Sequence, residues 1–242
     1  MIPTVCMVIF GMVGLKDDYK KLVLKDPEGM SASKKMLGLF IASAIFLGLQ
    51  IVLKHIAPEL IIPFFMQPLV IPMIAFVLFN IVVLLSITNA INFTDGLDGL
   101  ASGVSVIILT FLTLSAMRSG NVEVALFGAI VIGSTIGFLM FNLKPAKVFM
   151  GDTGSLALGA AIGMMAILLK MPIYLLIAAI IPVIEVVSVI IQVVFFKITK
   201  GKRFFKMAPI HHHFEMSGWS ENVIVFIFWV ITALACLGAY LI

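Results

Sequence analysis

Long uncharged runs separated by short polar segments make up most of this sequence. A helix needs about 20 mostly apolar residues to cross a bilayer, where its backbone groups must bond to one another. The uncharged runs predict membrane spans over residues 1–15, 36–53, 69–91, 99–117, 124–143, 154–169, 171–196 and 222–242. We therefore expect an all-α protein, a polytopic membrane bundle of about eight transmembrane helices that forms one domain over residues 1–242.

The composition and the distribution of charge agree with a membrane protein. Hydrophobic residues make up 62% of the chain and charged residues 12%, which is about half the charged fraction of a soluble domain. The net charge of +4 could suggest a nucleic-acid partner, but topology explains it better. If the spans alternate, only Lys54, Arg118 and Lys170 of the 16 basic residues fall on one side. The excess of basic residues on the other side marks that side as cytoplasmic and places both termini outside. We therefore expect the lipid bilayer as a partner and no nucleic acid.

One polar segment, NAINFTDGLDGLASG, ends an apolar run with two amides and two acids. Asn89 and Asn92 would share a face on a last helical turn, as would Asp95 and Asp98 if the helix continued. The alternative is a polar loop in which Asp98 or Thr94 caps the following span. A cap explains one acid but not the whole group, so we interpret the segment as one wall of a site.

Two further polar segments fall on the same predicted side. GLKDDYKKL contains Asp17 and Asp18, whose side chains diverge by about 100° on a helix, so that directing both at one atom requires a distortion or a bridging cation. A solvated acid pair is the alternative. NLKPAKVFMGDTGS contains Lys144, Lys147 and Asp152. Asp152 could cap the next span, but a cation beside an anion suits a phosphate and its metal better.

The last cytoplasmic loop contains KITKGKRFFKMAPIHHHFEMSGWSE. Its basic part suits anionic lipid headgroups. His211, His212 and His213 are consecutive and lack the i, i+4 spacing of a helical zinc motif, so we interpret them as partners of phosphate or sugar oxygens. Glu185 is the only charge deep within a predicted span and follows Pro182, which can break the helix there. We interpret Glu185 as structural support.

The loops on one predicted side thus gather aspartates, lysines, asparagines and histidines, whereas the opposite loops carry few such groups. Mg²⁺ binds through one or two carboxylates together with substrate phosphates. Lysines and the metal would offset the charge of a diphosphate during phosphoryl transfer. The pattern therefore predicts an Mg²⁺-dependent enzyme that joins a water-soluble phosphorylated donor to a lipid acceptor.

Four motifs carry a resemblance to a known family. In order and spacing, GLKDDYKKL, TNAINFTDGLDGLASG, NLKPAKVFMGDTGSLALG and APIHHHFEMSGW resemble the motifs of the polyprenyl-phosphate N-acetylhexosamine-1-phosphate transferases. PIHHHFE resembles the phospho-N-acetylmuramoyl-pentapeptide transferase branch in particular. The segment that resembles the family's third span begins at Met1, so we expect an N-terminally truncated transferase domain that lacks two helices and the first cytoplasmic loop.

The resemblance also implies roles for individual residues. Asp152 would be the main Mg²⁺ ligand, with Asp17 and Asp18 close to it as catalytic groups. The residues expected to line the same catalytic cleft are Asn89, Asn92 and Asp95. The residues expected to contact the uridine nucleotide are Lys21, Gly96, Leu97, Asp98, Asn142 and Phe149. The residues expected to face the sugar phosphate, also as catalytic groups, are His211, His212 and His213.

The implied reaction is the attack of undecaprenyl phosphate on the sugar-linked phosphate of UDP-N-acetylmuramoyl-pentapeptide, which forms lipid I and releases UMP in peptidoglycan synthesis. It would take place at the cytoplasmic face of the bacterial inner (plasma) membrane. Two mechanisms are open: an aspartate nucleophile with a covalent intermediate, and direct in-line attack assisted by Asp17. We favour direct attack, because a phosphate monoester with a second pKa of about 6 is already mostly a dianion at neutral pH.

Three alternatives remain. A sister enzyme would use UDP-N-acetylglucosamine as the donor. An ion or solute transporter with an acidic vestibule would carry polar residues through several spans, whereas this sequence offers only Glu185 there. An inactive fragment is the third. A homodimer is a candidate assembly.

Overall fold

The computed structural model describes residues 2–65 and 67–242 of the chain. The long helices are α1 (Ile2–Leu22), α2 (Ala32–Val52), α3 (Met73–Thr94), α4 (Leu100–Arg118), α5 (Val122–Asn142), α6 (Gly151–Leu168), α8 (Ile180–Ile198) and α10 (Glu221–Leu241). The short helices are the 3₁₀ helix η1 (Pro172–Tyr174), α7 (Leu175–Ala178) and α9 (Ile210–Glu215). In the described part of the chain, 7 helices, all the long ones except α1, are long and apolar enough to cross a membrane. The predicted all-α polytopic bundle is confirmed.

The first predicted span, residues 1–15, is part of a longer and more polar helix. α1 continues to Leu22 through a charged segment that includes Asp17 and Asp18. Lys20 and Lys21 lie in its last turn, where positive charge interacts favourably with the carbonyl end of a helix. The two aspartates therefore project from a regular helix rather than from a loop.

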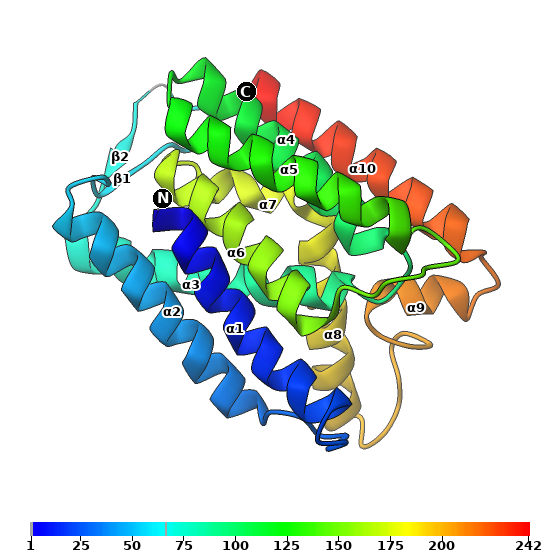
Figure 1. Cartoon of the computed structure of the whole chain (residues 1–242). Coiled ribbons are helices and arrows are strands. Elements are labelled where there is room, and N and C mark those ends of the chain that lie inside the picture. The colour runs from blue at the N-terminus through cyan, green and yellow to red at the C-terminus, as the bar shows by residue number, and fades with distance from the viewer. Residues whose placement is uncertain (1, 66) are drawn as a thin grey trace.

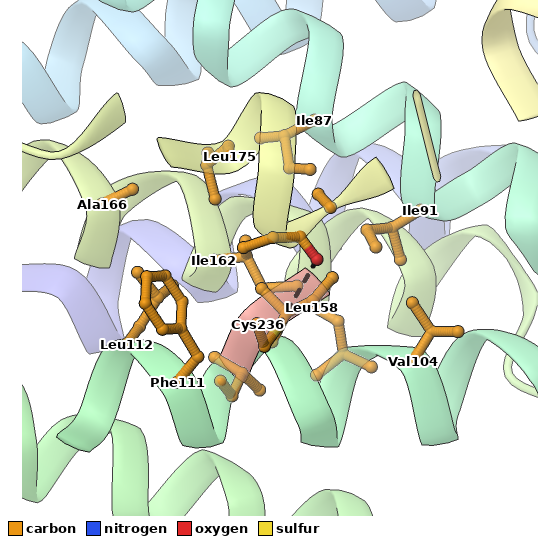
Figure 2. Close-up of a cluster of buried hydrophobic side chains, with 14 of the residues drawn as sticks. Ile87, Ile91, Val104, Phe111, Leu112, Leu158, Ile162, Ala166, Leu175 and Cys236 are labelled. Carbon is orange, nitrogen blue, oxygen red and sulfur yellow. Dashed lines mark hydrogen bonds between the residues drawn. The ribbon is translucent and has the colours of Figure 1, made fainter. Parts of the chain in front are cut away.

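α4 and α6 form the centre of the bundle (Figure 1). α6 lies against α1 and α3, and α4 lies against α5 and α10. Figure 2 shows side chains from α3, α4, α6, α7 and α10 meeting in one buried apolar cluster, which includes Ile87, Val104, Ile162, Leu175 and Cys236. Because lipid tails are as apolar as these side chains, close packing rather than removal from water holds such helices together.

Glycines let the backbone of α6 approach its two neighbours. A Cβ atom at Gly14 of α1 would lie 2.2 Å from the carbonyl oxygen of Asp152 in α6. A Cβ atom at Gly159 of α6 would lie 2.6 Å from the Cα of Thr88 in α3. These contacts leave no room for a side chain. They bring the polar ends of α1, α3 and α6 together at one place.

The connection between α2 and α3 contains a short antiparallel hairpin that the sequence pattern did not predict. β1 (Glu59–Leu60) pairs with β2 (Leu69–Val70). The span expected from residue 69 therefore begins later, at Met73, directly after Pro72. Proline lacks an N–H group and favours extended backbone in the residue before it, so a helix can start after Pro72 but not run through it. The hairpin lies at the end of the bundle opposite α9 (Figure 1).

The span expected over residues 171–196 is broken. η1 and α7 precede the long helix α8, and the interruption falls at Ala179. Pro182 explains the position, because its ring clashes with the carbonyl of the residue four positions earlier, which is Ala178 at the end of α7. Pro182 itself lies in the first turn of α8, where its missing N–H costs no intrahelical bond.

Candidate active site

Three carboxylates from two helices meet where the polar part of α1 contacts the start of α6. Asp17 and Asp18 come from α1, and Asp152 comes from the first turn of α6. One oxygen from each lies within 4.8 Å of the others. Although neighbouring side chains on a helix diverge, Asp152 is close enough to both to complete one acidic cluster. The cluster could hold a metal ion.

Asp18 binds the start of α6 with both carboxylate oxygens. Oδ1 accepts a hydrogen bond from the N–H of Asp152 at 3.1 Å, and Oδ2 accepts bonds from the N–H and the hydroxyl of Thr153 at 2.8 and 2.5 Å. The first N–H groups of a helix lack intrahelical partners and favour negative charge. Asp18 therefore caps α6 from a different helix. The alternative in which Asp152 caps its own helix is wrong, because Met150 occupies the capping position.

Asp17 is buried, with 2% of its surface exposed. Its Oδ1 accepts a hydrogen bond from the N–H of Met30 at 2.5 Å, and its Oδ2 lies 2.5 Å from the Lys21 ammonium nitrogen. The loop that follows α1 thus folds back over Asp17. The alternative of a solvated acid pair is wrong, because Asp17 is buried and Asp18 is bonded to α6.

Asp152 contacts a lysine from α2 and an asparagine from α3. Its Oδ2 lies 2.7 Å from the Lys35 ammonium nitrogen and 3.7 Å from that of Lys21. Its Oδ1 accepts a hydrogen bond from the side chain of Asn92 at 2.8 Å. Lys35 also donates to the Asn92 side-chain oxygen at 3.3 Å. Four helices therefore contribute to the surroundings of one carboxylate.

Of the two lysines beside the acids, Lys21 was among the predicted site residues and Lys35 was not. We expected Lys144 and Lys147 near Asp152, but Lys144 pairs with Glu221 at the start of α10. Lys35 takes that place and was not among the predicted site residues. Its only signal in the sequence was a position in a basic pair on the predicted cytoplasmic side, which many surface lysines share.

α3 ends at Thr94, so Asp95 and Asp98 lie in the loop before α4 rather than on a continued helical turn. Burial, together with the negative charges of Asp152 and Asp18, raises the pKa of Asp95 from 3.8 to about 7. A carboxyl group with a pKa near the pH of the cell is suited to exchange a proton during a reaction. The catalytic role of Asp95 stays a prediction, with this electrostatic property in its favour.

Asp98 and Asn142 hold the segment between α5 and α6. Asp98 Oδ2 accepts a hydrogen bond from the N–H of Ala146 at 2.9 Å. Asn142 is 4% exposed and donates from its side chain to the carbonyl of Val148 at 3.0 Å. Among the described residues, no side chain caps the start of α4 at Gly99, so the alternative in which Asp98 or Thr94 caps it is wrong. Contacts of Asp98 and Asn142 with a nucleotide stay predictions.

The other residues expected at the cleft differ in exposure. Phe149 is 77% exposed, whereas Leu97 is 8% exposed. Gly96 and Lys21 are at the surface, and Asn89 is half-buried on the last turns of α3. The exposed ring of Phe149 is free to stack on a flat ligand, whereas Leu97 packs into the core. The nucleotide contacts of these residues also stay predictions.

The three histidines lie on α9, within a segment expected to be a loop. His211 is 0% exposed, and its Nδ1 lies 3.0 Å from Oε1 of Glu185 in α8. His212 and His213 are half-buried, and His212 Nδ1 lies 2.6 Å from Oε2 of Glu215. The three side chains therefore have different surroundings. His211 is buried against Glu185, and contacts of the three histidines with a sugar phosphate stay predictions.

An apolar groove of about 520 Å³ lies between α3 and the broken segment η1, α7 and α8. Its lining includes Phe79, Val83, Leu176 and Val187, and it reaches Ala90, the neighbour of Asn89 in α3. The groove thus lies in the apolar part of the bundle and extends to the helix end that carries the amides of the site.

The carboxylates suit a hard divalent cation, which prefers oxygen ligands. Each carboxylate oxygen can accept at two positions, so the hydrogen bonds already made by Asp17, Asp18 and Asp152 leave capacity for a cation. Acids that can hold a metal ion, with lysines beside them, are groups that suit the transfer of phosphate-linked groups, because metal ions and cations stabilise the charge of the reacting phosphate.

Comparison with known proteins gives the class. The family model described as "Glycosyl transferase family 4" matches residues 1–170. The chain belongs to this family, and it is a phosphoglycosyl transferase.

Its relatives carry a more particular name. The chain is 50% identical over 231 residues to the phospho-N-acetylmuramoyl-pentapeptide-transferase of Acetivibrio thermocellus, an alignment that covers 94% of this chain and 69% of that protein. It is 47% identical over 240 residues to the protein of the same name from Clostridium beijerinckii, covering 98% and 72%. The corresponding protein of Clostridium kluyveri is 45% identical over 241 residues, covering 100% and 75%.

Proposed function

We propose that this protein transfers phospho-N-acetylmuramoyl-pentapeptide from UDP to undecaprenyl phosphate, which forms lipid I and releases UMP in peptidoglycan synthesis. The reaction would take place at the cytoplasmic face of the bacterial inner membrane. The names of the relatives support phospho-N-acetylmuramoyl-pentapeptide as the transferred group, over a sister donor or a transport function. The observation that carries the proposal is the convergence of Asp17, Asp18 and Asp152 with Lys21 and Lys35.

Asp152 is the proposed main ligand of Mg²⁺, with Asp17 and Asp18 close to it. When bound, the ion would offset negative charge on the diphosphate of the donor as its bond to UMP breaks. The ammonium groups of Lys21 and Lys35 already contact these carboxylates and can neutralise phosphate oxygens of the donor or acceptor.

The apolar groove between α3 and α8 is the proposed path of the polyprenyl chain. Its lining is almost entirely apolar, as an isoprenoid tail requires. A tail in the groove would bring its phosphate to the end that reaches Ala90, beside Asn89. The phosphate of the lipid would then reach the acidic cluster while its tail stays in the membrane, and the donor would reach the same cluster from water.

Direct attack of the lipid phosphate remains the favoured mechanism. An oxygen of undecaprenyl phosphate would form a bond to the sugar-linked phosphorus while the bond from that phosphorus to the oxygen of UMP breaks. Asp17 is 2% exposed, and its oxygens contact Met30 and Lys21, which disfavours it as a nucleophile. A phosphoenzyme trapped on another aspartate in Asp17→Asn would contradict direct attack.

The test uses the purified full chain in detergent or nanodiscs with undecaprenyl phosphate, Mg²⁺ and each of two donors in turn. We expect UMP release and a lipid product with UDP-N-acetylmuramoyl-pentapeptide. Activity should be lost in Asp152→Asn and retained in Glu28→Ala, which changes an exposed acid of the loop after α1. Turnover of UDP-N-acetylglucosamine alone would show that the donor is wrong, and no turnover with either donor would reject the proposed function of this chain.

A further inference from the structure

Glu185 and His211 form a buried pair far along the sequence from the acidic cluster. Both residues are 0% exposed, Glu185 in α8 and His211 in α9. Nδ1 of the imidazole lies 3.0 Å from Oε1, close enough for an ion pair but not aligned for a hydrogen bond. Among the described residues, neither oxygen of Glu185 and neither ring nitrogen of His211 has a hydrogen-bond partner. Buried polar groups are costly without partners, so each of these side chains depends on the other.

The opposite edge of the imidazole contacts the loop between α3 and α4. A Cβ atom at Gly96 would lie 2.2 Å from Nε2 of His211 and 2.7 Å from Cε1. The ring therefore fills the space that a side chain at residue 96 would need. Gly96 directly follows Asp95, and the negative charges of Asp152 and Asp18 act on the carboxyl group of Asp95. His211 thus lies between α8 and the backbone next to Asp95.

We propose that Glu185 is a positioning residue, which orients the imidazole of His211 so that the ring supports Gly96 and keeps Asp95 beside the acidic cluster. The Glu185 carboxylate is 3.0 Å from one ring nitrogen, and this contact holds the buried ring in its orientation. Without the carboxylate, a buried imidazole with no partner would leave its position and the loop over residues 95–99 would lose its support. The consequence for catalysis rests on the proposed function, but the positioning can be measured without substrate.

Hydrogen–deuterium exchange in the full chain measures the positioning directly. In Glu185→Ala, we expect amides of residues 95–99 and 210–215 to exchange about tenfold faster, because His211 lies in the second segment and contacts Gly96 in the first. Glu185→Gln retains volume and an acceptor oxygen, so we expect exchange close to that of the unchanged protein. Thr232→Ala is the matched control. It removes a buried hydroxyl whose only described bond is to the Phe228 carbonyl of its own helix.

A general loss of stability would speed exchange throughout the bundle, including α2 and α5, and would contradict a local positioning role. Unchanged exchange of residues 95–99 in a folded Glu185→Ala protein would also overturn the proposal. If that variant does not fold, Gly96→Ala gives the reciprocal test, since its Cβ would displace the ring while Glu185 is intact. Faster exchange of residues 210–215 in Gly96→Ala supports the coupling, and unchanged exchange contradicts it.

Kinetics then connect the positioning to the reaction. We expect Glu185→Ala to lower kcat/KM for the donor by about 100-fold, the scale that a misplacement of about 1 Å produces, with Glu185→Gln restoring most of it. If Glu185→Ala is fully active although its amides over residues 95–99 exchange faster, the order of this loop does not affect catalysis and the positioning role is rejected. If the unchanged protein is inactive, by contrast, the proposed function is contradicted. The exchange experiment uses no substrate, so it still tests whether Glu185 positions the loop.

Discussion

Asp18 and Thr153 are joined across two helices by two hydrogen bonds, because Asp18 Oδ2 accepts from both the N–H and the hydroxyl of Thr153, at 2.8 and 2.5 Å. Thr153 follows Asp152 in the first turn of α6. The carboxylate next to the acidic cluster therefore also fixes the helix that carries the proposed metal ligand. Asp18 thus both stabilises α6 and belongs to the acidic cluster that could hold a metal ion.

Replacing Asp18 with alanine should destabilise the protein by about 0.5–2 kcal/mol, the usual cost of removing a helix cap. Asp18→Asn should retain most of this stability, since asparagine caps about as well as aspartate. Thermal unfolding in detergent measures both. Glu28→Ala serves as the control. Equal losses for the alanine and asparagine variants would indicate that the charge, rather than the cap, stabilises α6.

Mg²⁺ should raise the unfolding temperature of the protein, because a ligand that binds only the folded state stabilises it. At a concentration of about 100 times Kd, the gain is about 2.7 kcal/mol. We expect Asp152→Asn to abolish the shift and EDTA to reverse it in the unchanged protein. Glu28→Gln, an exposed change outside the cluster, should leave the shift intact. An undiminished shift in Asp152→Asn would place the cation elsewhere.

Gly14→Ala should be strongly destabilising, because its Cβ would lie 2.2 Å from the Asp152 carbonyl oxygen, a backbone atom that cannot move without shifting α6. Such overpacking costs about 1–3 kcal/mol or more. Gly48→Ala is the matched control in α2, where a Cβ would have no neighbour within 4 Å in the described part of the chain. Alanine there should stabilise the helix by roughly 0.5–1 kcal/mol. Thermal unfolding of the two variants should therefore shift in opposite directions.

Asp95 should make the stability of the protein in EDTA depend on pH. Its pKa is raised from 3.8 to about 7 by burial and by Asp152 and Asp18. Below pH of about 4, the group is protonated in both states and has no effect. Between these two pKa values the unfolded chain ionises while the folded protein keeps the proton, so stability falls as pH rises and levels off above about 7.

The measurement compares unfolding temperatures of the unchanged protein and Asp95→Asn across this pH range. The unchanged protein should lose stability relative to Asp95→Asn as pH rises from about 4 to about 7, because asparagine does not ionise. A difference that stays constant over the range would show that the pKa of Asp95 is not raised.

The hydrophobic pattern was sufficient for the class of fold, since a run of apolar residues long enough for a bilayer has few other structures available. It was not sufficient for helix ends. The second strand of the hairpin, Leu69–Val70, and the break at Ala179 lie inside apolar runs, where hydrophobicity does not change. The prolines at residues 72 and 182 were the available signals, and their effect depends on how the flanking segments pack.

By itself, the sequence determined which polar residues belong together, because the spacing of spans and loops assigns Asp17, Asp18, Asp95 and Asp152 to one side of a membrane bundle. Only the tertiary structure decided what each residue contacts. A hydrogen bond requires its two atoms to lie about 3 Å apart. The order of spans and loops in the sequence shows only at which end of the bundle a residue lies. The capping of α6 by Asp18 and the burial of His211 against Glu185 therefore follow from how the helices pack.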